Sequence, residues 1–240
     1  MDLSSKERSG HSRRAEMVGR YRHLPMREWP QEAYDSVGIM NPVTTGNLRF
    51  WLQLLEETKG MGGAVVECGT YKGESIAPLA WIMRETGDDR PLYGFDSFEG
   101  LPVPRPEDAT KSGYEGRPAQ YFAQTSLEYV RGLLDALGVS DRVELVKGFF
   151  EDTLPGAATG PISVLILDCD LYESYKACLQ YLYGKVLPGG YIVFDEYYSP
   201  RYPGARIAID EFFADKPEKP TLASHLLEID PYERWFVRKR

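Results

Sequence analysis

The sequence VVECGTYKGES, residues 65–75, predicts a short buried strand, a tight turn and the start of a helix. We expect the strand over Ala64–Cys68, where small and β-branched residues dominate. Gly69 and Gly73 let the turn fold tightly and allow a ligand to approach the backbone closely. The segment lacks the full Gly-x-Gly-x-x-Gly pattern, so a nicotinamide dinucleotide site is disfavoured.

Strands and helices alternate along the rest of the chain. Further strands are expected over residues 92–97, 142–147, 162–167, 191–194, 221–229 and 234–238. Helices are expected over residues 47–58, around 76–83, and over 127–137, 174–183 and 204–213. This order predicts an α/β fold with a doubly wound, mostly parallel sheet. A C-terminal hairpin, with its turn at Asp230-Pro231-Tyr232, should add one antiparallel strand.

Local signals set several of the expected boundaries. Thr44 and Thr45 can cap the helix over 47–58, and Thr125-Ser126-Leu127-Glu128 has the pattern of a capping box. Gly138 should end the helix that this box begins. Pro78 is tolerated near the start of its helix, and Leu187-Pro188-Gly189-Gly190 predicts a turn before the strand over 191–194.

The first residues differ in character from the remainder. We expect an N-terminal arm over residues 1–43 and a catalytic domain over 44–240. Six Lys or Arg residues fall within the first 22 positions, a pattern that indicates a solvated arm. Apolar residues between Tyr21 and Met40 would also allow the arm to cover a ligand as a lid. Both interpretations remain open at this point.

Composition excludes several classes of protein. The chain has 240 residues with 28 Lys and Arg against 36 Asp and Glu, a net charge of −8. Binding to nucleic acid or to an anionic membrane through bulk charge is therefore not expected. Three cysteines without paired spacing exclude a disulfide scaffold and a cysteine-rich zinc site, and they fit a reducing cytoplasm. No apolar run is long enough to suggest a membrane span.

Carboxylates or glycines follow five of the predicted strands. Ligands of doubly wound sheets bind beyond the carboxyl ends of the strands, so these positions should meet at one edge. They are Glu67-Cys68-Gly69, Asp96-Ser97, Gly148 with Asp152, Asp168-Cys169-Asp170, and Asp195-Glu196. Several like charges in one place require a cation or a hydroxyl-rich ligand to compensate them.

Two kinds of ligand are indicated by these strand ends. Asp96 ends the second strand, where an acid usually accepts hydrogen bonds from ribose hydroxyls, so an adenosine-type ligand is expected. No Lys-Ser/Thr pair of a P-loop is present, which argues against a triphosphate. Asp168, Asp170, Asp195 and Glu196 offer hard oxygen ligands, which suit Mg²⁺ or Mn²⁺. The three histidines match no zinc spacing.

Six segments together resemble the TylF-type (macrocin) O-methyltransferases, which include the sugar methyltransferases of mycinamicin and novobiocin biosynthesis. The segments are VVECGTYKGES, GFDSFEGLP, LVKGFFEDTLP, LILDCDLYES, LPGGYIVFDEY and PGARIAIDEF. The resemblance extends over residues 44–215. It implies a class I methyltransferase fold, S-adenosylmethionine as methyl donor, a divalent metal (Mg²⁺ or Mn²⁺) and a homodimer or larger homo-oligomer.

The resemblance also implies roles for individual residues. Asp168, Asp195 and Glu196 match the metal ligands, although the family usually has Asp where this chain has Glu196. Asp170 matches the proposed general base. The residues expected to contact the cofactor are Glu67, Gly69, Thr70, Tyr71, Gly73, Ser75, Asp96, Ser97, Gly148, Phe150, Asp152 and Asp168.

The implied reaction is O-methylation of a sugar hydroxyl in a glycosylated natural product, with a vicinal diol as the expected acceptor. One alternative is a metal-dependent nucleotide-sugar glycosyltransferase, which would explain Asp168-Cys169-Asp170 but not the glycine loop with Asp96. The other is a non-catalytic relative that binds the cofactor. A nucleophilic role for Cys68 or Cys169 is disfavoured, because no histidine lies close in sequence to activate a thiol.

Overall fold

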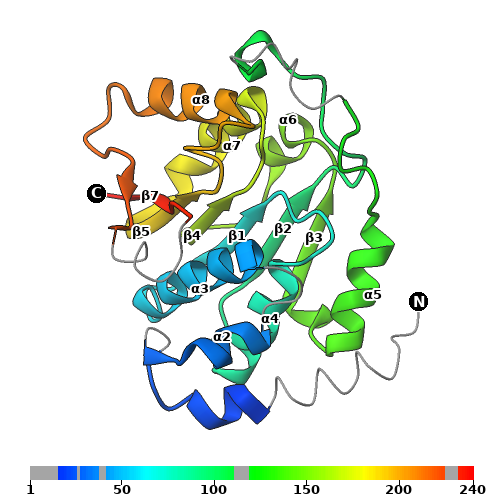
Figure 1. Cartoon of the computed structure of the whole chain (residues 1–240), viewed down its shortest axis with the longest axis vertical. Helices are drawn as coiled ribbons and strands as arrows, with labels where there is room; N and C mark the ends of the chain where they lie inside the picture. Colours follow the sequence, from blue (N-terminus) through cyan, green and yellow to red (C-terminus); the bar gives the residue numbers. More distant parts are fainter. Residues whose placement is uncertain (1–15, 26–27, 38–41, 111–118, 225–231) are drawn as a thin grey trace.

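The computed structural model describes residues 16–25, 28–37, 42–110, 119–224 and 232–240 (Figure 1). Its centre is a seven-stranded sheet in the order β3-β2-β1-β4-β5-β7-β6. The strands are β1 (Ala64–Cys68), β2 (Leu92–Asp96), β3 (Val143–Lys147), β4 (Ile162–Leu167), β5 (Val186–Phe194), β6 (Thr221–Leu222) and β7 (Trp235–Arg238).

The pairing of the strands confirms the predicted fold class. β1 to β5 pair in parallel, and β7 runs antiparallel to both β5 and β6. The strand order steps outward from β1 in both directions, so the carboxyl ends of β1 and β4 flank the point where the order reverses. Ligands of such sheets bind at this point.

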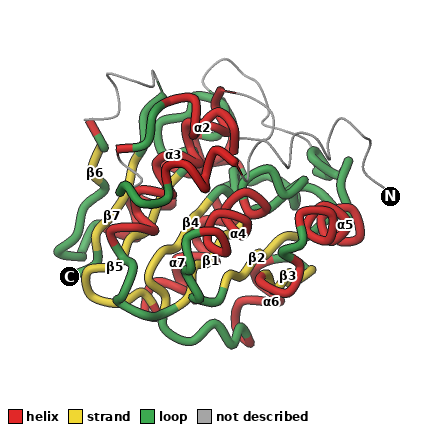
Figure 2. Tube along the Cα trace, turned by 90° about the horizontal axis from the view of Figure 1, so that it is seen from below, coloured by secondary structure: helices red, strands yellow, loops and turns green. Residues whose placement is uncertain are grey.

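Helices cover both faces of the sheet (Figures 1 and 2). One layer holds α2 (Gln31–Val37), α3 (Pro42–Glu57), α4 (Ile76–Glu85) and α5 (Leu127–Leu137). The other holds α6 (Phe150–Thr153), α7 (Tyr172–Leu182) and α8 (Pro203–Phe213). Short 3₁₀ turns lie at η2 (Pro106–Asp108), η3 (Ser140–Arg142), η4 (Leu154–Gly156) and η5 (Tyr183–Lys185).

The two layers bury alternate residues of the same strands. Val65 and Ile166 pack into the core under α3 and α4, whereas Val66 and Leu165 pack into the core under α7 and α8. Every residue of β4 is buried, which explains why this strand is apolar except for Ser163, whose hydroxyl donates to the Ala64 carbonyl. Burial of each apolar side chain contributes about 1.5–3 kcal/mol.

The C-terminal end of α5 confirms Gly138, but the predicted capping box Thr125–Glu128 is wrong, because Ser126 and not Thr125 is the N-cap. The Ser126 side chain accepts a hydrogen bond from the Tyr129 amide, and Gly138 follows the helix in the left-handed region at φ 67°. Thr125 lies outside the cap and donates its hydroxyl to the Tyr71 carbonyl at 2.8 Å. The start of α5 is thereby tied to the loop after β1.

Two predicted boundaries were wrong. α3 begins at Pro42 rather than at residue 47, so Thr44 and Thr45 lie within the helix and do not cap it. Proline is favoured in the first helical turn, where its missing N–H has no partner to lose. The predicted turn Leu187–Gly190 belongs to β5, where the register with β4 passes from Val186 to Tyr191 and leaves these residues as a bulge.

The C-terminal hairpin is shorter than predicted. β6 contains only Thr221 and Leu222, although the Ala223 amide continues the pairing to the Arg234 carbonyl at 2.8 Å. Residues 225–231, which include the expected turn at Asp230-Pro231, lie outside the described residues. Among the helices that the structure describes, none combines the length and apolar character needed to cross a bilayer.

The described part of the N-terminal arm packs on the core. Residues 16–21 are helical, and Val18, Trp29, Ala33 and Tyr34 are buried in the cluster that also contains α3 and α4. The Arg49 guanidinium lies 4.5 Å from the centre of the Tyr34 ring. The expected boundary at residue 43 falls inside α3, and the division into arm and domain stays a prediction.

Candidate active site

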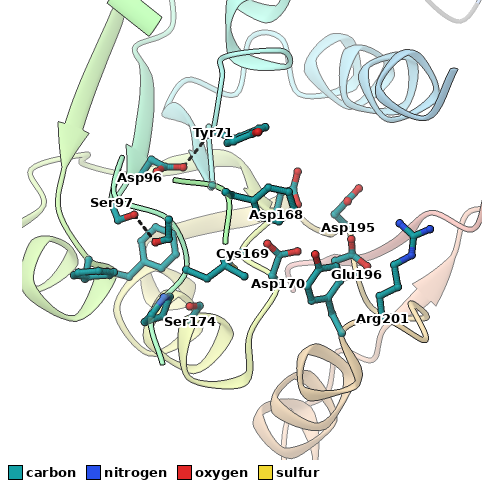
Figure 3. Close-up of a pocket in the computed structure, with 18 of the residues that line it drawn as sticks. Tyr71, Asp96, Ser97, Asp168, Cys169, Asp170, Ser174, Asp195, Glu196 and Arg201 are labelled. Atoms are coloured by element: carbon teal, nitrogen blue, oxygen red, sulfur yellow. Dashed lines mark hydrogen bonds between the residues drawn. The ribbon is translucent and has the colours of Figure 1, made fainter. Parts of the chain in front are cut away.

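A cavity of about 280 Å³ opens at the carboxyl ends of the central strands (Figure 3). The predicted site residues that line it are Gly69, Tyr71, Asp96, Ser97, Phe150, Asp168, Asp170, Asp195 and Glu196. Glu67, Thr70 and Ser75 are buried beside the same loop, and Gly73 is also outside the cavity wall. Gly148 and the exposed Asp152 do not line the cavity either.

Gly69 is required by the close approach of β1 and β4. Its φ is +99°, and a Cβ at this position would lie 1.8 Å from the Asp168 carbonyl oxygen. The Gly69 amide donates to the Phe95 carbonyl at 2.8 Å, and the Asp168 amide donates to the Cys68 carbonyl at 3.0 Å. The loop is therefore held between its two neighbouring strands before it turns into α4.

Asp96 is anchored by backbone amides. Its carboxylate accepts hydrogen bonds from Tyr71 at 2.8 Å and from Phe98 at 2.6 Å, and both donors have positive φ angles, 44° and 51°. Burial raises the pKa of Asp96, and these amides oppose the rise. The fixed carboxylate faces a cavity where a ribose would supply hydroxyl donors.

Glu67 is a buried acid that is only partly satisfied. The Ser75 hydroxyl donates to Oε1, while Oε2 has no hydrogen-bond partner among the described residues. Burial raises the pKa of Glu67 to about 8, and the charges of Asp96 and Asp195 add to the rise. A cationic group in the cavity would stabilise the ionised form. S-adenosylmethionine carries an ammonium and a sulfonium group, so the site fits this cofactor.

Three carboxylates from neighbouring strands converge on the other side of the cavity. One oxygen each of Asp168, Asp195 and Glu196 lies within 4.8 Å of the other two. Burial and the Asp195 charge raise the pKa of Asp168 well above its usual range, and they raise that of Glu196 to about 7. Because a divalent cation relieves such repulsion and prefers oxygen ligands, the cluster fits Mg²⁺ or Mn²⁺.

Asp170 lies next to this cluster in a left-handed conformation. Its φ is 59°, it is only 8% exposed, and its carboxylate faces the cavity between Asp168 and Glu196 (Figure 3). Such a backbone conformation is costly for a residue other than glycine and is found preferentially at functional sites. The turn between β4 and α7, which contains Asp170, is held in place because the Tyr172 amide donates to the buried Asp108 carboxylate at 2.8 Å.

Cys169 also lines the cavity, but its thiol is protonated and therefore a poor nucleophile. Burial raises the pKa of its thiol to about 11, so the nucleophilic thiolate is not formed near neutral pH. Cys68 and Cys178 are buried in the same core, and burial raises the pKa of both thiols well above the usual range. The structure thus gives no support to a cysteine nucleophile.

Sequence reasoning missed several lining residues. They are Asn47, Gly100, Leu101, Pro102, Phe122, Phe149, Glu151, Ser174, Arg201 and Tyr202. Six of these residues fall inside the quoted motifs, so their positions could have been inferred: Gly100, Leu101, Pro102, Phe149, Glu151 and Ser174. Asn47 comes from α3 and Phe122 from the long connection after β2. Nothing in the local sequence pattern predicts that either reaches the sheet edge.

Comparison with known proteins shows the family of the chain. A family model described as macrocin-O-methyltransferase (TylF) matches residues 3–238. The 8-demethyl-8-(2,3-dimethoxy-alpha-L-rhamnosyl)-tetracenomycin-C 4'-O-methyltransferase of Streptomyces olivaceus is 34% identical over 174 residues, which cover 71% of this chain and 65% of that protein. The chain thus spans slightly less than two thirds of this relative.

Two further comparisons cover more of the chain. Demethyldecarbamoylnovobiocin O-methyltransferase of Streptomyces niveus is 32% identical over 224 residues, 89% of this chain and 79% of that protein. The solved structure of the O-methyltransferase NovP superposes with a TM-score of 0.67 at 30% identity, over 92% of this chain and 88% of that one. The chain therefore belongs to the macrocin-O-methyltransferase (TylF) family, whose members are S-adenosylmethionine-dependent O-methyltransferases.

Proposed function

We propose that the chain transfers the methyl group of S-adenosylmethionine to a sugar hydroxyl of a glycosylated natural product, with the help of a divalent metal ion. The convergence of Asp168, Asp195 and Glu196 beside the glycine loop is the observation that carries the proposal. Membership of the family supports the methyl donor and the reaction type.

The cofactor would bind over the ends of β1 and β2. Asp96 would accept hydrogen bonds from the ribose hydroxyls, and Ser97 lies beside it in the cavity wall. Gly69 would allow the cofactor backbone to approach the strand end closely. Glu67, buried beside the glycine loop, would supply negative charge near the methionine end of the cofactor, because no described residue pairs with its second oxygen.

Asp168, Asp195 and Glu196 would hold the metal ion. A bound divalent ion lowers the pKa of a coordinated hydroxyl and orients it. Glu196 stands where the family usually has Asp, and its side chain is longer by one methylene. Its carboxylate still reaches the other two acids, which supports its role as a ligand.

Asp170 would accept the proton of the acceptor hydroxyl. The carboxylate lies in the cavity wall beside Asp168, and the fixed turn after β4 holds it there. When bound, S-adenosylmethionine would supply the methyl group, and Asp170 would take the proton of the acceptor hydroxyl as its oxygen replaces sulfur on the methyl carbon. Fixing both reactants in line contributes about 7–11 kcal/mol to the lowering of the barrier.

The names of the relatives support a glycoside as the acceptor. Their names describe methylation of a rhamnosyl group on tetracenomycin and of demethyldecarbamoylnovobiocin. We favour a vicinal diol as the acceptor group because it would place two oxygens toward the carboxylate cluster. In the named rhamnosyl acceptor, which is 2,3-dimethoxylated, the second oxygen would be that of a methoxy group. A homodimer or larger assembly and a cytoplasmic location remain predictions of the sequence.

A methyl-transfer assay tests the proposal. Purified protein would be incubated with S-adenosylmethionine and a panel of deoxysugar glycosides, with Mg²⁺ or with EDTA, and products would be detected by mass spectrometry. We expect a mass gain of one methylene unit on at least one glycoside, lost in EDTA. Cofactor binding without transfer to any glycoside would favour the non-catalytic alternative, and calorimetric binding of a UDP-sugar instead of S-adenosylmethionine would favour a glycosyltransferase.

A further inference from the structure

Asn47 connects the N-terminal helical layer to the carboxylate cluster. It lies in the first half of α3, is only 5% exposed and lines the cavity. Its side-chain Nδ2 donates a hydrogen bond to Oδ1 of Asp195, 148 residues later in the chain. Among the described residues of α3, it alone lines the cavity.

The other end of the Asn47 amide is unsatisfied. Its Oδ1 is buried and has no hydrogen-bond partner among the described residues. Leaving a buried acceptor unpaired costs about 1–3 kcal/mol. The neighbouring α3 residues Leu48, Phe50 and Trp51 are fully buried apolar side chains, so an apolar residue at position 47 would suit the packing better.

The hydrogen bond to Asp195 fixes the orientation of the amide. Rotating the amide by half a turn would place Oδ1 against the Asp195 carboxylate, and two acceptors would then face each other. Oδ1 is therefore held in an orientation in which no described residue donates to it, and a bound molecule can supply the donor. Most buried side-chain polar atoms in proteins have a hydrogen-bond partner, so an unpaired one beside a cavity points to a ligand.

We propose that Asn47 is a positioning residue of the reaction. Nδ2 holds the Asp195 carboxylate toward Asp168 and Glu196 for the metal ion, and Oδ1 accepts a hydrogen bond from an N–H or O–H group of a bound reactant. The donor is either the ammonium group of the cofactor or a hydroxyl of the acceptor. The inference rests on the proposed function and adds to it a residue outside the carboxylate motifs.

Asn47→Leu tests both roles, because it keeps the approximate shape and removes both polar atoms. Gln53→Leu, an amide-to-leucine change in the same helix, is the matched control. Mn²⁺ affinity would be measured by calorimetry without cofactor, S-adenosylhomocysteine affinity without metal, and the acceptor KM and kcat separately. We expect Asn47→Leu to weaken Mn²⁺ binding 10- to 100-fold and Gln53→Leu to leave it unchanged.

The remaining readouts identify the donor. Weaker binding of S-adenosylhomocysteine assigns it to the cofactor, and a raised acceptor KM assigns it to the acceptor. Mn²⁺ affinity within twofold of the wild type would overturn the positioning role, and unchanged values for both reactants would overturn the role of Oδ1. Asn47→Ala replaces Asn47→Leu if the latter does not fold. Absence of Mn²⁺ binding in the wild type would refute the proposed metal site itself, before any variant is made.

Discussion

Replacing Glu67 by Gln should make the ligand-free protein more stable at alkaline pH. Glu67 is fully buried, and burial raises its pKa to about 8 from an ordinary value near 4.5. Between these two values the folded state holds a proton that the unfolded state has released. The free energy of unfolding therefore falls as the pH rises from 4.5, and the loss is complete above pH 8. Gln stays neutral and removes this dependence.

The size of the stability change follows from the shift in the pKa of Glu67. The free energy of unfolding of Glu67→Gln, taken relative to that of the wild type, should rise by about 3 kcal/mol between pH 6 and pH 9. Gln can still accept the Ser75 hydrogen bond, and its second polar atom stays as unpaired as Oε2 of Glu67. The comparison therefore isolates the charge.

Urea unfolding of both proteins at several pH values, followed by tryptophan fluorescence, measures the difference directly. The same change should weaken binding of S-adenosylhomocysteine, because the cofactor ammonium loses its counter-charge. Ser75→Ala serves as a control that keeps the carboxylate and removes its hydroxyl donor. A stability difference that does not change with pH, or one that favours the wild type at pH 9, would refute the claim that Glu67 is a buried acid with a raised pKa in the ligand-free protein.

Further predictions concern the strand ends. Asp170→Asn should slow methyl transfer about 10²–10⁴-fold while calorimetry finds S-adenosylhomocysteine affinity unchanged, and turnover like that of the wild type would remove the base assignment. Asp168→Ala should abolish the stimulation of turnover by Mg²⁺; wild-type activity that ignores EDTA would count against the metal role. Gly69→Ala should cost about 3–5 kcal/mol in urea unfolding, because its Cβ would meet the Asp168 carbonyl oxygen. Gly60→Ala, at a similar φ of +93° with nothing within 4 Å, should cost less, and equal costs would show that the contact with Asp168 is unimportant.

The sequence predicts the carboxyl ends of the parallel strands well, because their signals are local. The apolar run Ile162–Leu167 is buried on both faces, and this pattern allows little besides a central strand. Ser126 and Gly138 act as caps through hydrogen bonds and backbone angles that the nearest residues decide. Because ligands bind beyond the carboxyl ends of parallel strands, the sequence alone predicts that the acids that follow these strands lie at one edge of the sheet.

The residues that sequence reasoning missed depend on contacts between distant segments. Asp108 receives the amides of Arg105 and Tyr172, both at 2.8 Å, and thereby attaches the connection after β2 to the start of α7. Phe122 reaches the cavity wall on this connection. Asn47 is similar, because helical periodicity predicts a buried face of α3 but not that this face reaches Asp195.

The metal site beside the cofactor is the central claim, and anomalous diffraction tests it most directly. Crystals would be grown with Mn²⁺ and S-adenosylhomocysteine, and data would be collected at the manganese edge. We predict one strong anomalous peak bounded by the carboxylates of Asp168, Asp195 and Glu196, with the cofactor ribose on Asp96. Cofactor density without a peak among these three acids, or with manganese bound elsewhere, would contradict the account.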